Sequence, residues 1–306
     1  MKIMIPGGAG FFGRNFVRVW NEEGRSLKEL VVLDKDSVGL ESVKSFGVKT
    51  VCADLAVSGM WEQEFTTADI VLCLNAQISG KLRETFEKNN VVAVKNVLSA
   101  AKKAGIKKIL HFSSAAVLSV RKDDYALTKE IGQKLVEKSG LQYTILQPSI
   151  MFGLTDTKNI GWLISFARKC PVFPIPGHGR YPRQPIFVDD VCRLVIKMLD
   201  NLPKNKAYSI NGKEIVFFKD IIKAVLRAMG GFRFAVHIPV WVFKFCMMVG
   251  NKVMKNAPFT PDQLDSLTSG DVFPDYPWWD EFSIQVTSFE EGVKKMLAED
   301  AILKKN

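Results

Sequence analysis

The middle of the chain contains a tyrosine, a lysine and a serine whose types and spacing suit proton transfer. Tyr125 and Lys129 are four residues apart, so their side chains share one face if this segment is helical. An ammonium beside a phenol stabilises the phenolate and lowers the phenol pKa from its usual value of about 10. Such a phenol exchanges a proton with a hydroxyl or carbonyl during hydride transfer, and Ser114 is expected to hydrogen-bond the same oxygen.

The meaning of this spacing depends on the neighbouring elements, because tyrosine and lysine often stand four residues apart on exposed helices. A helix is predicted from Tyr125 to Lys138, closed near Gly140. The apolar run Lys108–Phe112 predicts a strand, and Ser114 follows its carboxyl end. The three side chains are therefore expected where a strand leads into the next helix.

A glycine-rich stretch near the start of the chain predicts what accepts the hydride. Residues 2–16 fit a short strand, a tight turn and the first turn of a helix. Gly8, Gly10 and Gly13 follow G-x-G-x-x-G, which permits the turn, a close approach of backbone to a pyrophosphate and helix-on-strand packing. The N–H groups at the helix start would hold the anion, so we predict a dinucleotide site that includes Phe11 and Phe12.

The second predicted strand indicates which dinucleotide is bound. Leu30–Asp34 is apolar and ends in an acid, 21 residues after Gly13. A carboxylate at this place accepts hydrogen bonds from the adenosine ribose and repels the extra phosphate of NADP, so the sequence favours NAD. Arg14 and Lys35 are a counter-signal, because a nearby cation accommodates that phosphate, and NADP stays open.

Other predicted strands also end in residues that can contact ligands. They lie at 48–52, 70–74 and 143–146, and an acid after the first can meet the adenine amino group. The candidate cofactor contacts at these ends are Asp54, Leu55, Asn75, Ala76 and Pro148, and Gln77 is a candidate substrate contact. Strands that alternate with helices and are apolar on both faces predict an α/β fold with a doubly wound parallel (Rossmann) sheet.

This alternation stops after about Phe152, and proline and glycine crowd residues 171–185. We therefore predict a Rossmann domain at residues 1–170, to which residues 185–200 return, and a smaller, mainly helical substrate lobe at 171–306. A strand at 186–188 is expected to rejoin the sheet, with Asp189 capping the next helix. Thr287 and Glu290 predict a capping box for the last helix.

Composition excludes several classes of protein. The net charge is +10, but the lysines are spread over many helices, which indicates a generally basic surface without a nucleic-acid-binding module. The histidines lack metal-ligand spacing, so no metal site is expected. Five scattered cysteines suggest reduced thiols, and the first strand leaves no room for a signal peptide, so a cytoplasmic protein is expected.

Taken together, these motifs resemble the extended short-chain dehydrogenase/reductase superfamily, in its branch of NAD-dependent epimerases and dehydratases. The resemblance covers almost the whole length and follows the family's order. It is carried by Gly7, Gly10 and Gly13, Asp34, Asp54, Asn90, Ser113 and Ser114, Tyr125 and Lys129, residues 148–153 and residues 187–191.

The resemblance implies roles for individual residues. Tyr125 would be the catalytic acid/base, Lys129 would hold the nicotinamide ribose, and Ser114 would position the reacting oxygen. Asn90 would match the family's asparagine on the long helix predicted at 83–103. Arg183 matches an arginine that grips the pyrophosphate of a sugar nucleotide. The family also suggests a homodimer built from two long helices.

The sequence departs from the family's pattern in four ways, and the last of them, the missing second pyrophosphate arginine, weakens the sugar-nucleotide interpretation. Leu118 stands where the family often has tyrosine, and Pro6 replaces the usual threonine of the first turn. Only 11 residues separate Ser114 from Tyr125, where many sugar epimerases have a longer loop, and no arginine follows Arg233. The interpretation we rank first is still an NAD-dependent oxidoreductase or epimerase acting on a sugar nucleotide through a keto intermediate. Dehydration ranks lower because Ala115 and Ala116 stand where its acid–base pair is expected.

Two alternatives stay open. Residues 177–190 and 259–264 resemble a subgroup that includes the accessory NAD(P)H-binding subunit of respiratory complex I, which suggests a non-catalytic scaffold. The apolar stretch 234–253 suggests a sterol-like or lipid-like substrate, or contact with a membrane surface. The simpler expectation for this stretch is an amphipathic helix packed on the core of the lobe.

Overall fold

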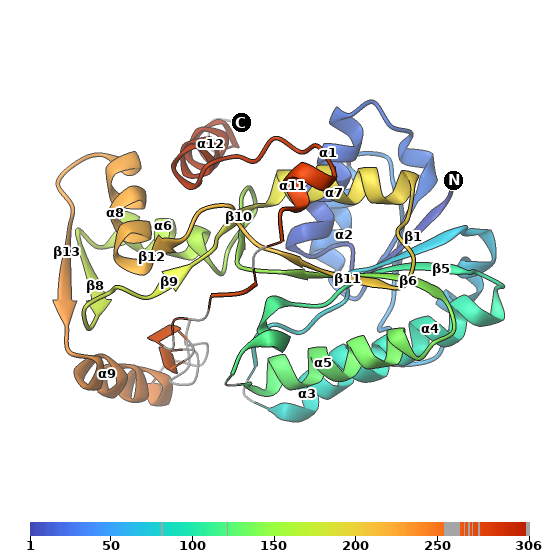
Figure 1. Ribbon diagram of the computed structural model, residues 1–306, viewed down its shortest axis with the longest axis horizontal. Helices are drawn as coiled ribbons and strands as arrows, with labels where there is room; N and C mark the ends of the chain where they lie inside the picture. The colour runs from blue at the N-terminus through green and yellow to red at the C-terminus, as the bar shows by residue number, and fades with distance from the viewer. Residues whose placement is uncertain are drawn as a thin grey trace. The chain divides into compact units, whose positions relative to one another are not determined.

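A parallel sheet of seven strands forms the centre of the first of two compact units (Figure 1). The computed structural model describes residues 1–80, 82–120, 122–253, 264–265, 267–268, 270, 272–274 and 276–303. Neighbouring strands in the sheet are all parallel, which confirms the predicted doubly wound fold. In spatial order the strands are β11 (Lys206–Ile210), β6 (Gln142–Pro148), β5 (Lys108–Phe112), β4 (Ile70–Cys73), β1 (Ile3–Pro6), β2 (Leu30–Asp34) and β3 (Lys49–Cys52).

Helices cover both faces of this sheet, so its strands are apolar on both sides (Figure 1). The face beneath α4 and α5 buries Val71 and Ile109 of the sheet with Val97 of α4 and Val136 of α5. On the other face, Phe16 and Trp20 of α1 are completely buried. The helices of this unit are α1 (Phe11–Glu22), α2 (Ser37–Lys44), α3 (Arg83–Glu87), α4 (Ala93–Lys103), α5 (Asp124–Glu137), α7 (Val188–Asp200) and α11 (Trp278–Glu281).

The predicted long helix at 83–103 contains one wider turn. Residues Lys88–Val92 form a π-helical segment, η3, between α3 and α4. Such segments often place side chains at functional sites. The remaining short helices of the unit are η1 (Leu27–Glu29), η2 (Met60–Thr67) and η4 (Ala115–Leu118).

The second unit comprises Ile150–Phe187, Asn211–Pro274 and Val286–Asn306. Its core is formed mainly by α6, α8 and α12 around Phe152 and Phe187. Within the described residues, no helix has the length and apolar composition needed to cross a membrane. Its elements are β7 (Met151–Phe152), α6 (Ile160–Lys169), β8 (Val172–Pro176), β9 (Pro182–Arg183), β10 (Ile186–Phe187), β12 (Val216–Phe217), α8 (Phe218–Met229), β13 (Phe234–Ile238), α9 (Val240–Val253) and α12 (Phe289–Leu303).

Three local expectations were wrong. The strand expected to rejoin the sheet is β10, which pairs with β7 in a separate two-stranded sheet, whereas β11 completes the main sheet. Asp189 does not cap a helix, because α7 already begins at Val188. The last helix begins after Ser288, whose Oγ accepts the Glu291 N–H, one residue beyond the expected capping box.

Candidate active site

The glycine-rich turn joins β1 to α1 at the centre of the sheet. Gly7 has a φ of 78°, and a Cβ there would lie 2.4 Å from the backbone nitrogen of Asn75. A Cβ on Gly13 would lie 2.2 Å from the carbonyl oxygen of Gly8. Both glycines are therefore required by close backbone packing, which fixes the first turn of α1 at the carboxyl end of β1.

Gly10 is required for a different reason. Its φ of −71° suits any residue, and an added Cβ would meet only the Gly7 carbonyl oxygen at 3.4 Å. Gly10 precedes α1, whose first turn contains no acidic residue, and Phe11 and Phe12 begin the helix. The open backbone and the helix dipole together fit the pyrophosphate of a dinucleotide.

Asp34 lies at the end of β2, close to this turn. Its Oδ2 accepts the Ala9 N–H at 3.1 Å and its Oδ1 accepts the Asp36 N–H at 3.1 Å. Burial raises the pKa of its carboxyl, and these backbone hydrogen bonds oppose the rise only in part. The Nζ of Lys35 donates to Oδ1 of Asn89 at 2.7 Å.

The next strand ends carry the other predicted cofactor contacts. Asp54 forms an ion pair with Lys88 at 2.8 Å, and this hydrogen-bonded partner lowers the pKa of the carboxyl. Leu55 is buried, and Pro148 ends β6 in register with Ile210 of β11. Asn75 is buried and donates to the carbonyl oxygen of Asn89, whereas Ala76 is exposed.

Asn90 links the end of β4 to α5. Its Oδ1 accepts the Gln77 N–H at 2.6 Å, and its Nδ2 donates to the Gln77 carbonyl at 3.1 Å and to Thr128 Oγ1 at 2.9 Å. The π-helical segment carries Asn90 and Asn89, which are both engaged with this loop. Asn90 therefore positions the strand end against the helix that carries Tyr125.

Tyr125 lies in the first turn of α5, next to Ser114. The helix begins after Asp123, whose Oδ1 accepts the Ala126 N–H at 2.8 Å. Ser114 lies close enough to the Tyr125 phenol to affect the pKa of that phenol, and its Oγ accepts the Ala116 N–H at 3.2 Å. Burial raises the pKa of the phenol, and Ser114 opposes this rise. The pair is thus brought together as the sequence predicts.

Lys129 occupies a buried position beneath the tyrosine's helical turn. Its side chain is 2% exposed, and Nζ donates to the Phe112 carbonyl oxygen at 2.6 Å. Burial lowers the pKa of this ammonium to about 8. Its charge lowers the pKa values of the neighbouring Cys73 and His111, whereas the pKa of the Tyr125 phenol is raised by burial and not lowered as the spacing predicts.

Arg183, the predicted substrate contact, belongs to the second unit. Its guanidinium is buried and donates to the backbone carbonyls of Pro182 and Leu267. The Phe259–Gln263 part of the alternative resemblance lies outside the described residues. Among the described residues, no cluster of three or more histidine, cysteine or acidic side chains could hold a metal ion.

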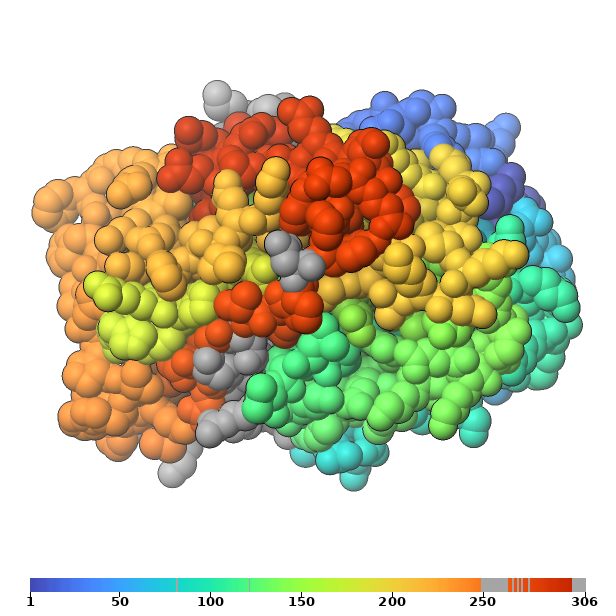
Figure 2. All heavy atoms as spheres, in the orientation of Figure 1, coloured from blue at the N-terminus to red at the C-terminus, as the bar shows by residue number. Residues whose placement is uncertain are grey.

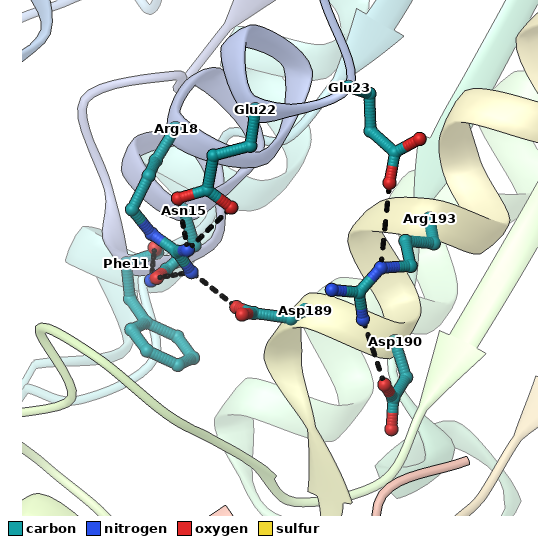
Figure 3. Close-up of polar contacts among 8 residues, drawn as sticks. All are labelled: Phe11, Asn15, Arg18, Glu22, Glu23, Asp189, Asp190 and Arg193. Atoms are coloured by element: carbon teal, nitrogen blue, oxygen red, sulfur yellow. Dashed lines mark hydrogen bonds and ion pairs between the residues drawn. The ribbon is translucent and has the colours of Figure 1, made fainter. Parts of the chain in front are cut away.

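An ion pair between distant segments holds the cofactor helix in place (Figure 3). Arg18 of α1 contacts Asp189 of α7 and, at 2.9 Å, Glu22. Burial lowers the pKa of Arg18, but these two acids raise it and the net shift is upward. Nearby, Arg193 pairs with Asp190 at 3.3 Å. Sequence reasoning missed this network, because 171 residues separate its two halves and neither half has a local motif.

The model of the NAD-dependent epimerase/dehydratase family matches residues 3–211, which reach from β1 to the end of β11. The chain belongs to this family. It is therefore an enzyme of the NAD-dependent epimerase/dehydratase type, and its cofactor is NAD. The glycine turn and Asp34 lie within the matched region.

Known relatives are distant from this chain. A 4-hydroxy-2-methyl-3-oxo-4-farnesyl-3,4-dihydroquinoline-1-oxide ketoreductase of Stigmatella aurantiaca is 23% identical over 75% of this chain and 74% of that protein. A 3beta-hydroxysteroid-dehydrogenase/decarboxylase of Arabidopsis thaliana is 23% identical over 96% and 78%, respectively. Among solved structures, a UDP-glucose 4-epimerase of Thermotoga maritima has a TM-score of 0.80 at 20% identity, covering 99% of this chain and all of that one.

Proposed function

We propose that this enzyme oxidises or reduces a hydroxyl or ketone group of an apolar substrate, with Tyr125 as the acid/base. The observation that carries the proposal is the proximity of the Tyr125 phenol to Ser114 on the same unit as the buried Lys129 and the glycine turn. We assign cofactor binding to this first unit and substrate binding to the second.

In the proposed reaction, bound NAD supplies the acceptor for a hydride. Ser114 orients the substrate oxygen, and Tyr125 takes or returns its proton. Lys129 provides positive charge near the nicotinamide ribose, and Asn90 holds the loop after β4 in place. The Gly10 backbone and the start of α1 would bind the pyrophosphate, and the Asp34 carboxylate would accept hydrogen bonds from the ribose hydroxyls.

Two observations favour an apolar substrate over a sugar nucleotide. The Arg183 guanidinium is already bound to backbone carbonyls, which leaves it poorly placed to grip a pyrophosphate. The relatives described above are named for a farnesyl-bearing compound and a hydroxysteroid. A sugar nucleotide, ranked first from sequence, is therefore kept as the competing outcome of the experiment.

The first prediction concerns Tyr125. Purified enzyme with NAD should form NADH from a sterol or long-chain secondary alcohol, and Tyr125→Phe should lower this rate by about 100-fold or more. Tyr143→Phe, on β6, is the matched control and should retain activity. Conversion of UDP-glucose without oxidation of any apolar alcohol would replace the proposed substrate class. Unchanged turnover in Tyr125→Phe would remove Tyr125 from the mechanism.

A further inference from the structure

The second unit exposes six large apolar side chains on consecutive elements. Phe234 and Val236 are two residues apart on β13, and Trp241, Phe245 and Met248 follow the i, i+4, i+7 spacing of one face of α9. We call them the β13–α9 face: Phe232 (87% exposed), Phe234 (45%), Val236 (39%), Trp241 (75%), Phe245 (59%) and Met248 (45%).

The β13–α9 face lies on elements next to the core of the second unit, but its side chains are exposed. Ala235, between the two exposed residues of β13, is half-buried and packs against the core of the second unit, whereas Phe234, Val236 and His237 are exposed. Within this stretch, Val240–Val253 form a helix as expected, whereas Phe234–Ile238 form a strand. Figure 2 shows residues 234–248 of this stretch in orange as part of the second unit. Exposed apolar side chains in such number generally mark an interaction surface.

The charge of the chain is concentrated around the same elements. Residues 157–187 and 221–253 contain ten of the 42 lysines and arginines and none of the 32 acidic residues. The rest of the chain therefore has 32 of each, and these two segments hold the entire net charge of +10. They include α6, β8, β13 and α9. The excess of cations therefore lies in these two segments, although Lys244 pairs with Asp265 at 2.8 Å and Lys223 with Asp220 at 3.8 Å.

We propose that the β13–α9 face binds the surface of a bilayer that contains anionic phospholipid. Aromatic and aliphatic side chains enter the boundary between headgroups and acyl chains, and cations beside them attract the lipid phosphates. Trp241 is suited to this boundary because its ring is apolar and its N–H is polar. α9 itself contains no acidic residue, and its Lys244 forms an ion pair with Asp265 at 2.8 Å.

The same charges argue against a second copy of the chain as the occupant. Two copies joined through this face would bring two cationic surfaces together, each without compensating acids in the segments named above. Within the described residues no helix can span a membrane, so the contact is with the bilayer surface. Binding does not depend on the proposed substrate and is measured without it.

The test uses the full chain and vesicles of phosphatidylcholine, with or without phosphatidylglycerol. Wild-type protein should float with the anionic vesicles, and added salt should release it because screening weakens the attraction of the cations. The double variant Trp241→Glu, Phe245→Glu should lower the partition coefficient at least about tenfold. Met60→Glu, at an equally exposed apolar residue of the first unit (82%), is the control and should bind as wild type does.

A second measurement guards against misfolded variants. Anionic vesicles should shift the wild-type tryptophan emission to the blue, and Trp241→Phe should lose this shift, since the other five tryptophans are buried or half-buried. Three results would overturn the proposal. They are no flotation at low salt, equal flotation of the double variant, and a dimer of the free protein that the double substitution dissociates.

Discussion

Among single residues, Lys129 is a buried lysine, and burial disfavours the charged form of its side chain. Its pKa falls from 10.5 to about 8, which corresponds to a cost of about 3 kcal/mol for the charged form in the folded protein. We expect Lys129→Met to abolish activity and to raise the free energy of unfolding at neutral pH by about 1–3 kcal/mol, because the cost of the buried charge is removed and only partly offset by the loss of the donor to the Phe112 carbonyl. Urea unfolding of both proteins measures the difference.

The pH dependence provides the control for this second prediction. Between about 8 and 10.5 the unfolded chain keeps the lysine proton that the folded chain has released, so wild-type stability rises with pH in this window. The advantage of the methionine variant should therefore be largest below pH 8 and shrink above it. An advantage independent of pH would mean that Lys129 does not titrate as inferred.

His111 makes a contribution of the same sign at lower pH. It is completely buried in β5, neither ring nitrogen has a hydrogen-bond partner, and burial with the nearby Lys129 charge lowers its pKa well below 6.5. The unfolded chain takes up a proton below pH 6.5 and the folded chain does not, so stability falls with decreasing pH. Our third prediction is that His111→Leu removes this loss, about 1.4 kcal/mol per pH unit.

Thermal or urea unfolding between neutral and mildly acidic pH measures this effect. At neutral pH the leucine variant should be as stable as wild type or more so, because two unpaired nitrogens are removed. His178→Leu, at an exposed histidine, is the matched control. If the free energies of unfolding of wild type and His111→Leu fell equally as the pH is lowered, His111 would be protonated in the folded protein.

At the scale of elements, two glycines of the turn between β1 and α1 serve different purposes: Gly13 is needed for folding, and Gly10 is proposed to be needed for ligand binding. A Cβ on Gly13 would clash with the Gly8 carbonyl, whereas one on Gly10 meets only an ordinary contact. Our fourth prediction is that Gly13→Ala costs about 3 kcal/mol or more of stability. Gly10→Ala should cost no more than about 1 kcal/mol but weaken NAD binding at least about tenfold, because on our assignment its methyl group would stand against the pyrophosphate.

Melting curves and NAD titrations of the two variants separate these effects. Gly10→Ala should melt close to wild type without NAD and gain less from added NAD, since ligand stabilisation follows affinity. Equal NAD affinity of Gly10→Ala and wild type would place the pyrophosphate elsewhere.

Elements with a strong local pattern were predictable from sequence, and contacts between distant segments were not. The apolar run of β5 and the four-residue spacing of Tyr125 and Lys129 are local, so their helix and strand were located correctly. The partner of β10 depends on Met151–Phe152 and the role of Asp189 on Arg18, and no local property of either segment indicates these partners. The exposure of α9 was missed because apolar periodicity alone does not distinguish a buried face from an exposed one.

At the scale of the whole molecule, the chain passes repeatedly between its two compact units. The first unit contains Met1–Ser149 and Val188–Ile210, so α7 and β11 follow residues 150–187 of the second unit along the chain. β11 covers the edge of β6 with five paired residues, and α7 packs on α1 through Arg18 and Asp189. A chain cut at the predicted domain boundary near residue 170 would therefore lack the later segments of the first unit, including α7 and β11.

The fifth prediction follows from this connectivity. A chain ending at residue 170 lacks β11 and α7, which leaves β6 as an open edge and uncovers apolar surface of α1. We expect this fragment to show no cooperative thermal transition and no NAD binding. A chain ending at residue 211 restores both elements and should bind NAD, which circular dichroism and NAD titration can test against the full chain. A fragment 1–170 that melts cooperatively and binds NAD would show that the cofactor unit is complete without its later segments.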